Sequence, residues 1–307
     1  MRTRSTLALA ALLLATTASC GAETDADSEA TSPSEPASTS ESPTASPSPQ
    51  PIPTAAPAAE GEVRTDGVVT VIDAGSPQLC LGAVAMSLPP QCQGLPLLGW
   101  KWADHPGYDE RAGVRWGSYA VTGTWDGTSF TVTSAIPLDS YDPETPEPEL
   151  PDLSTPCPEP EGGWRVLKPA KTTTATMEAT FTEASRLPGF AEAWLDTSLD
   201  TSKTPGSDDP TKVIINVAVT EDLSGAKATL RKVWGGALCV TPAKYTEAQL
   251  TTMATELQQL PGVLSTSASR DLVEATVVYD DGSLQEWADA SYGEGRIEIS
   301  SALLPVE

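Results

Sequence analysis

The chain has 307 residues, a formal net charge of −24 and an isoelectric point near 4.2. Its length suits one or two folded domains. Because nucleic-acid phosphates would repel so acidic a chain, its composition argues against a nucleic-acid-binding function.

Residues 1–19 have the pattern of a secretory signal peptide. Arg2 and Arg4 supply a positive end, and residues 7–18 are mostly apolar. This run is shorter than the roughly 20 residues that a membrane-spanning helix needs, so we expect it to act as a cleaved signal.

Cys20 follows the small residues Ala18 and Ser19 at the end of the apolar run. These positions resemble the lipobox of bacterial lipoproteins, in which the cysteine is acylated and becomes the mature N-terminus. Thr17 departs from that pattern, because a leucine is usual there. Signal and following segment together resemble secreted lipoproteins of actinobacteria. The resemblance implies an anchor on the outer face of the cell membrane through Cys20, with an unanchored secreted protein as the alternative.

Two stretches, residues 20–62 and 138–163, are rich in proline and acidic side chains. Each contains eight acidic residues and no lysine or arginine. Neither can bury enough apolar surface to offset the entropy of ordering it. We expect the first to be a disordered tether and the second to be an extended linker.

Residues 63–137 are predicted to form a small all-β domain. Residues 67–73 are a β-branched run, and residues 117–136 alternate as two strands joined by Asp126 and Gly127. An Asp-Gly pair between alternating runs is a strong hairpin signal. The number and size of the expected strands resemble an OB-fold barrel.

Residues 164–307 alternate helix and strand signals and are predicted to form an α+β domain. Expected helices and strands alternate along this part of the chain: helices at 173–187, 221–234, 245–260 and 283–293, strands at 212–220, 237–241, 272–280 and 296–300. Thr246 with Gln249, and Ser283 with Glu286, have the spacing of capping boxes. The order resembles a ferredoxin-like sheet covered by helices, and no internal repeat is apparent.

The chain has five cysteines, an odd number that fits lipidation of Cys20. The other four allow two disulfides in an oxidising compartment, with three possible pairings. We favour Cys80–Cys92, which closes a local loop, together with Cys157–Cys239, which joins the linker to a predicted strand. Neither pair has zinc-site spacing, so we expect no metal.

Candidate catalytic residues are few. His105 is the only histidine and lies in a turn-rich, acidic loop, and no serine occupies a nucleophile elbow. Asp280 and Asp281 end a predicted strand, where active-site carboxylates often lie, but their position before Gly282 is typical of a strand-to-helix turn. We therefore predict that the chain is not an enzyme and uses no cofactor.

The predicted β domain contains four of the eight tryptophans of the chain, Trp100, Trp102, Trp116 and Trp125, of which Trp100, Trp102 and Trp125 are the candidates for a binding surface. Aromatic rings in small barrels stack on sugars or peptide prolines, although so small a domain also uses tryptophan for its core. The sequence predicts a non-catalytic lipoprotein that binds a protein, peptide or glycan, with these three tryptophans as candidate ligand-binding residues. A cell-wall hydrolase whose carboxylates meet only in the fold is the alternative.

Overall fold

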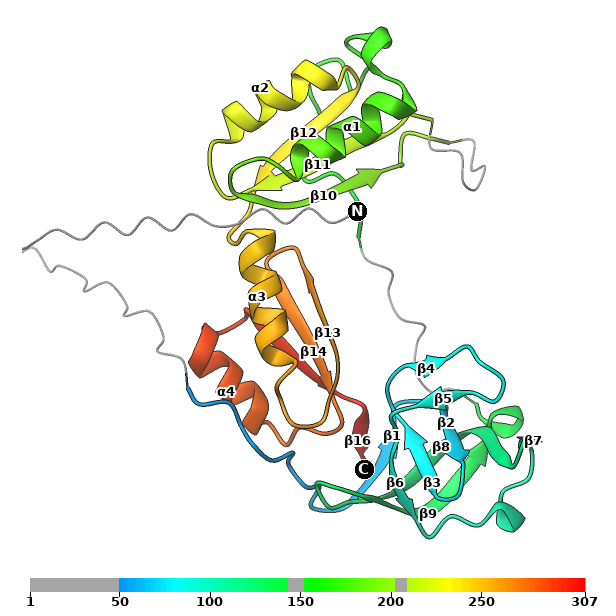
Figure 1. Cartoon of the computed structure of the whole chain (residues 1–307). Coiled ribbons are helices and arrows are strands. Elements are labelled where there is room, and N and C mark those ends of the chain that lie inside the picture. The colour runs from blue at the N-terminus through cyan, green and yellow to red at the C-terminus, as the bar shows by residue number, and fades with distance from the viewer. Residues whose placement is uncertain (1–49, 143–151, 202–208, 307) are drawn as a thin grey trace, which may run out of the picture. The chain divides into compact units, whose positions relative to one another are not determined.

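The computed structural model describes residues 50–142, 152–201 and 209–306. They form a mixed α+β protein with a closed five-stranded barrel-like sheet, several small sheets and four α-helices (Figure 1). This confirms the mixed class expected from sequence. Within these ranges, no helix is long and apolar enough to cross a membrane.

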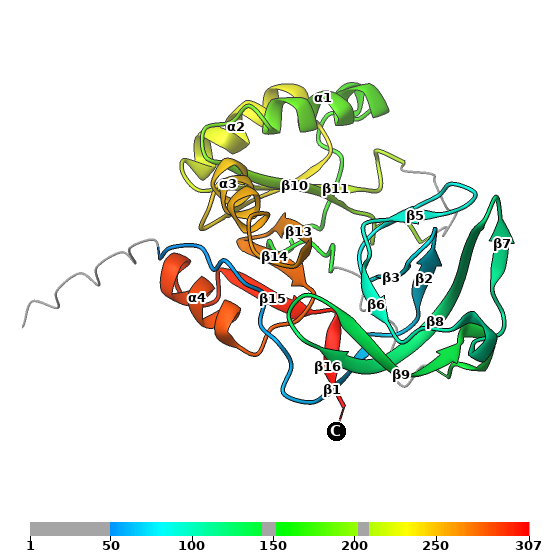
Figure 2. The ribbon, with the colours of Figure 1, turned by 60° about the horizontal axis from the view of Figure 1, so that its bottom comes forward.

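The barrel is a ring of strands built around one long strand. β8 (Val114–Trp125) pairs with β2 (Val69–Asp73) along its first half and with β9 (Phe130–Pro137) along its second half. β3 (Pro77–Cys80) and β6 (Leu95–Leu98) complete the ring, because β3 pairs with β2 and β6 pairs with β9 (Figure 2). The predicted turn at Asp126 and Gly127 joins β8 to β9, as expected.

Further strands extend this sheet. β1 (Glu62–Thr65) pairs with β8 and with β16 (Leu303–Pro305), so a strand from the end of the chain joins the first one. β7 (Asp109–Arg111) pairs with the start of β8, while β4 (Val84–Ala85) and β5 (Gln91–Cys92) form a separate two-stranded sheet. The predicted small β barrel is present, whereas its assignment as an OB-fold is not confirmed.

Residues 50–61, the end of the predicted tether, contact two parts of the fold. Trp125 Nε1 in the barrel donates a hydrogen bond to the Pro57 carbonyl at 2.8 Å. Trp287 Nε1, far along the chain, donates to the Pro51 carbonyl at 3.0 Å. This segment therefore lies against the folded part of the protein.

The other described residues contain two three-stranded sheets, each built with helices in one order: helix, strand, strand, helix, strand. The first unit contains α1 (Thr174–Ala184), β10 (Phe190–Asp196), β11 (Ile214–Val219), α2 (Leu223–Val233) and β12 (Ala237–Pro242). The second contains α3 (Glu247–Leu257), β13 (Val263–Ser269), β14 (Leu272–Val277), α4 (Ser283–Tyr292) and β15 (Ile297–Ser301). Short 3-10 helices lie at Trp102–Asp104, Leu138–Ser140 and Pro169–Lys171.

The two units are an internal repeat, and we call them repeat 1 (residues 173–242) and repeat 2 (residues 246–301). In both, the first strand pairs antiparallel with the second, and the second pairs parallel with the third. Both first strands shift register at the same place, just after Phe190 and just after Val263. The expectation of no internal repeat is therefore wrong. A ferredoxin-like arrangement in a single sheet is not confirmed.

A Leu-Pro-Gly sequence introduces the first strand of each repeat. The glycines, Gly189 and Gly262, have φ values of +67° and +72°, where glycine is favoured because it has no side chain. The two carbonyls accept equivalent hydrogen bonds of 2.8 Å, from Thr220 N and from Val278 N. The repeat is thus preserved down to single backbone contacts.

Both helices of a repeat cover the same face of its sheet. Leu230 of α2 packs in one buried cluster with Val217 of β11, and Leu284 of α4 packs in another with Ala275 of β14. These contacts join helices and sheet into a two-layer unit, which is visible in both repeats in Figure 1.

The opposite face of the sheet in repeat 1 is covered by residues 152–168, which we call the strap. The Cys157–Cys239 disulfide joins the strap to β12. Beside it, Trp164 of the strap packs against the buried Ile214 of β11. Repeat 1 is therefore covered on both faces of its sheet.

The first helix of each repeat begins with a capping box. Thr246 and Gln249 form the predicted one at the start of α3, and Thr173 and Thr176 form its equivalent at the start of α1. In each box the two side chains accept hydrogen bonds from backbone amides that lack partners within the helix.

The capping box predicted from Ser283 and Glu286 is not formed. The carboxylate of Asp280 instead accepts hydrogen bonds from Leu284 N at 2.9 Å and from Gln285 N at 3.3 Å. The two amides that the predicted box would satisfy are bonded elsewhere: Ser283 N donates to Asp281 Oδ1 at 3.1 Å, and Glu286 N donates to the Gly282 carbonyl at 2.9 Å. These contacts agree with the strand-to-helix interpretation of the acidic pair Asp280 and Asp281.

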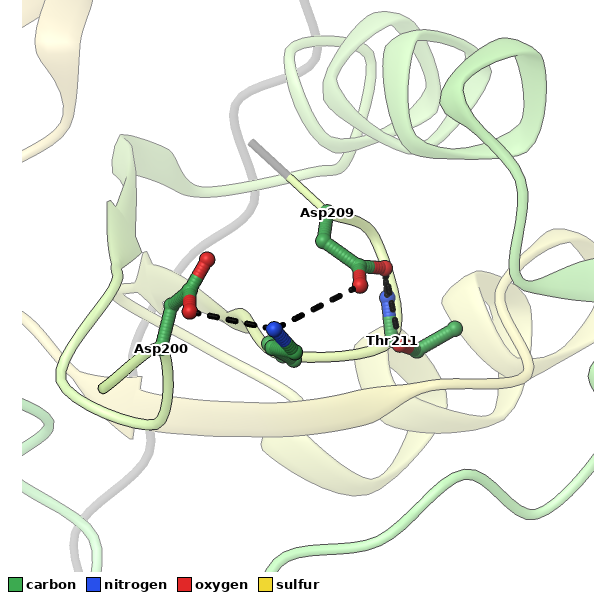
Figure 3. A network of polar contacts seen from close by, with 4 residues as sticks. Asp200, Asp209 and Thr211 are labelled. Atoms are coloured by element: carbon green, nitrogen blue, oxygen red, sulfur yellow. Dashed lines mark hydrogen bonds and ion pairs between the residues drawn. The ribbon is translucent and has the colours of Figure 1, made fainter. Parts of the chain in front are cut away.

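An ion-paired connection joins β10 to β11 in repeat 1. Lys212 Nζ lies 3.1 Å from Asp200 Oδ1 and 3.9 Å from Asp209 Oδ2, and Asp209 Oδ1 also accepts from Thr211 N at 2.9 Å (Figure 3). The two acids lie on either side of residues 202–208, which are outside the described residues. The lysine thus holds together the two described ends of this connection.

Candidate functional site

The predicted cysteine pairs are both present as disulfides. The Cα atoms are 5.9 Å apart in Cys80–Cys92 and 5.8 Å apart in Cys157–Cys239. The pairing favoured by the sequence is therefore confirmed. Cys20, the predicted lipidation site, lies outside the described residues.

The three tryptophans predicted to bind a ligand lie in the barrel core. Trp100 and Trp102 are each 7% exposed, and Trp125 is 3% exposed. Trp102 Nε1 donates to Asp73 Oδ2 at 2.9 Å, and the Trp100 ring stacks on His105 with centroids 3.9 Å apart. These contacts fit the core role that the sequence offered as the alternative, and a ligand role for the three rings stays a prediction.

His105 is packed against aromatic rings of the barrel. Burial lowers the pKa of its imidazole, although the neighbouring Asp104 acts in the opposite direction. The hydroxyl of Tyr119 donates to the His105 carbonyl at 3.1 Å. In the part of the chain that the structure describes, no group of three or more His, Cys, Asp or Glu side chains could hold a metal ion.

A pocket of about 260 Å³ lies where the strap, repeat 1 and repeat 2 meet. Its walls come from the strap, from β10 and the ends of β11 and β12, and from α3 and the turn between β13 and β14. The aliphatic lining consists of Pro156, Ala191, Ala218, Pro242, Ala243 and Leu250. The polar and aromatic lining consists of Asp152, Ser154, Glu192, Trp194, Thr241, Arg270 and Asp271.

Glu192 of β10 has an unsatisfied acceptor in this pocket. Its Oε2 is shielded from solvent and accepts no hydrogen bond from the described residues. Arg270 Nε lies 3.8 Å from this oxygen, beyond ordinary hydrogen-bond distance. Burial raises the pKa of the Glu192 carboxyl; the guanidinium and backbone amide of Arg270 oppose the rise, and Asp271 adds to it.

Arg270 is held against the pocket wall by other contacts. Its guanidinium lies 5.1 Å from the centroid of the Trp194 ring, within cation–π range. Its Nη2 donates to the backbone carbonyl of Asp152 in the strap. Trp194 Nε1 in turn donates to the carbonyl of Leu153 at 3.2 Å. The guanidinium therefore contacts the Trp194 ring and the Asp152 carbonyl, and its Nε stays 3.8 Å from Glu192 Oε2.

A two-residue turn presents Arg270 and Asp271 to the pocket. Both residues have positive φ, +47° and +76°, as the favoured two-residue hairpin turns require. Asp271 Oδ1 accepts hydrogen bonds from Lys244 N at 2.7 Å and Tyr245 N at 3.1 Å. These bonds fix the turn to the segment that joins the two repeats.

The charged residues of this pocket were not candidates in the sequence analysis. Asp152 and Arg270, which touch in the fold, are 118 residues apart in the chain. A local signal was present in the charged pair Arg270-Asp271, which separates two runs rich in small and β-branched residues. Glu192 and Trp194 carry no such signal, since they lie in an alanine-rich run.

Comparison with known proteins gives no relative from which to transfer a function. No protein-family model matches the chain, and no curated protein matches it. The pocket is therefore interpreted from its own residues.

Proposed function

We propose that this chain is a lipoprotein of the cell envelope whose ectodomain binds a group of a protein, peptide or glycan partner in the pocket, without catalysis. The observation that carries the proposal is Glu192 Oε2, which is shielded from solvent and accepts no hydrogen bond from the described residues. A buried polar group without a partner costs about 1–3 kcal/mol, which a bound donor would recover. Titratable groups whose pKa is shifted by burial are concentrated at functional sites, and burial raises the pKa of Glu192.

The proposed location rests on the chain outside the pocket. The signal-like N-terminus and Cys20 support an acyl anchor on the outer face of the membrane, and the two disulfides fit an oxidising compartment. We keep an OB-like barrel as part of this proposal, because five strands close its ring. Each repeat also keeps the layering of the predicted ferredoxin-like domain, with helices on one face of a sheet.

A carboxylate-dependent hydrolase is the second candidate, because Glu192 and Asp271 line the same pocket and the pKa of Glu192 is raised. The contacts of Asp271 favour binding over hydrolysis. Its Oδ1 accepts two backbone amides and holds the turn in place, which is a positioning role.

The test uses the full chain, produced in its own host and mixed with a soluble digest of the host envelope. We expect native mass spectrometry to show a reproducible extra mass that is lost in Trp194→Ala and kept in Trp287→Ala. Trp287 is the matched control, since it is also half-buried and also donates Nε1 to a backbone carbonyl, that of Pro51. It does not line the pocket.

Absence of the extra mass from the wild-type chain, or its retention in Trp194→Ala, overturns the proposal. Digest components that are cleaved by the wild-type chain and remain intact with Glu192→Gln would instead establish the hydrolase.

A further inference from the structure

We propose that the pocket binds a primary ammonium group at the end of an aliphatic chain, as in a lysine side chain of a peptide partner, with Glu192 Oε2 as its acceptor. The inference rests on the proposed binding function and names the chemical class of its ligand.

The charges of the pocket favour a cation. Three carboxylates (Asp152, Glu192 and Asp271) and one guanidinium (Arg270) line it, so its formal net charge is −2. That guanidinium is already shared among Trp194, the strap carbonyl and Glu192. A carboxylate group on the ligand would meet repulsion here, whereas an ammonium group would be attracted.

The hydrogen-bonding capacity of the pocket favours a donor. Glu192 Oε2 accepts nothing from the described residues. An ammonium group carries three donors and no acceptor, and its hydrogen bonds to a carboxylate are strengthened by charge. A ligand of this class therefore supplies what Glu192 lacks and leaves no acceptor of its own unsatisfied.

The aliphatic walls favour a methylene chain over a sugar ring. Ala191, Ala218 and Leu250 present no donors or acceptors on their side chains. The methylene stem of a lysine side chain can lie along such a surface while its charged end reaches a polar group. A hydroxyl of an amino sugar that lay against these three side chains would find no hydrogen-bond partner on them, which is costly.

The test measures binding of two small probes to the full chain by isothermal titration calorimetry. Nα-acetyl-lysine amide carries the ammonium group, and Nα,Nε-diacetyl-lysine amide has the same backbone without it. We expect the charged probe to bind at least tenfold more tightly than the neutral one, and to weaken as salt is raised.

Two variants locate the acceptor. Glu192→Gln keeps the shape of the side chain and removes its charge, and we expect it to weaken binding of the charged probe at least tenfold. Glu298→Gln is the matched control, because Glu298 is an exposed residue on β15 and does not line the pocket. We expect it to leave the affinity unchanged. Thermal unfolding of both variants checks that each remains folded.

Equal affinity for the two probes, or an unchanged affinity in Glu192→Gln, overturns the inference. Tighter binding of glucosamine than of the lysine probe would make the ligand an amino sugar and overturn the peptide assignment. If neither probe nor glucosamine binds while the envelope-derived mass still depends on Trp194, the ammonium inference fails and the proposed binding function stands.

Discussion

Repeat 1 and repeat 2 share one fold but differ on the sheet face that points away from their helices. At equivalent positions of the middle strand, repeat 1 has the buried residues Asn216 and Ala218, and repeat 2 has the exposed Glu274 and the half-buried Thr276. The same face of repeat 1 also carries the buried apolar residues Ile214, Ala237 and Cys239, which have to be covered and pack against Cys157 and Trp164 of the strap. A polar second face can remain in water, as antiparallel and mixed sheets commonly allow.

The pocket is a consequence of this difference. Where the strap leaves repeat 1 it reaches repeat 2, and Arg270 of repeat 2 donates to the carbonyl of Asp152 in the strap. If repeat 1 had the same polar second face as repeat 2, it would need no strap, and no strap would end at this point. The asymmetry between the repeats therefore produces the concave surface.

On the sheet faces that are covered by helices, the two repeats differ in where their large and small buried side chains lie. Ala226 and Leu230 of α2 occupy the positions that Leu284 and Ala288 occupy in α4, counted from the capping residues Asp222 and Asp280. All four are buried. The large and the small side chain have exchanged places, which keeps the total volume of the core nearly constant.

The largest expected effect concerns the strap. Replacing Cys157 and Cys239 together with serine opens a loop of sequence separation 82, and we expect a loss of about 4 kcal/mol in the free energy of unfolding. Hydrogen exchange should show the loss of protection in β11 and β12, with β14 and β15 unchanged. The matching double replacement of Cys80 and Cys92 should leave both repeats protected. Equal loss in the two repeats would contradict the role assigned to the strap.

Because leucine and alanine have exchanged places between the two repeats, a second substitution should restore part of the stability that a first one removes. Leu230→Ala should lower the free energy of unfolding by about 3 kcal/mol, because it leaves a cavity in a fully buried site. Adding Ala226→Leu reproduces the arrangement of repeat 2 and should recover part of the loss. Urea denaturation measures both variants. A double variant less stable than Leu230→Ala would show that the two helix positions are not equivalent.

The capping boxes should contribute equally to the two repeats. Thr173→Ala and Thr246→Ala each remove a side-chain acceptor from a helix start, and each should cost about 1 kcal/mol. Thermal unfolding of the two variants under one set of conditions gives the comparison. A clear difference between them would mean that the surroundings of the caps, and not the caps themselves, dominate.

The smallest expected effect is a pH dependence of the melting temperature that arises from Glu192 in the pocket. Because the pKa of Glu192, which faces Arg270, Asp271 and Asp152, is raised in the folded state, folding disfavours its ionised form relative to the unfolded chain. The associated stabilisation is present below the unfolded-state pKa of 4.5 and is lost as the pH rises through the folded-state value. Glu192→Gln should therefore raise the melting temperature at pH 7 relative to wild type.

That difference should disappear below pH 4.5, where the wild-type carboxyl is also neutral. Glu298→Gln, measured at the same pH values, shows whether the effect is specific to the pocket. A melting temperature that Glu192→Gln lowers at pH 7 would mean that the ion pair with Arg270 outweighs the cost of burying the carboxylate.

Several elements were predictable because their signals are local. Thr246 and Gln249 lie three residues apart and form their capping box within one helical turn, and Asp126 with Gly127 forms the expected turn between β8 and β9. The strands β10 and β13 were missed. Both are edge strands with many half-exposed or polar positions, so they lack the apolar alternation that marks a strand. With both missing, the repeated order of elements was not visible.

The sequence by itself determined the short-range features of this protein: its helices, its best hairpin and the features at its N-terminus that predict export. Each depends on residues within a few positions of one another, where backbone preference and side-chain hydrogen bonding act directly. The tertiary structure alone decided the duplication, the return of β16 to the barrel and the pocket. Glu192, Arg270 and Asp152 meet only because three distant segments pack together, and no local preference of the chain encodes that contact.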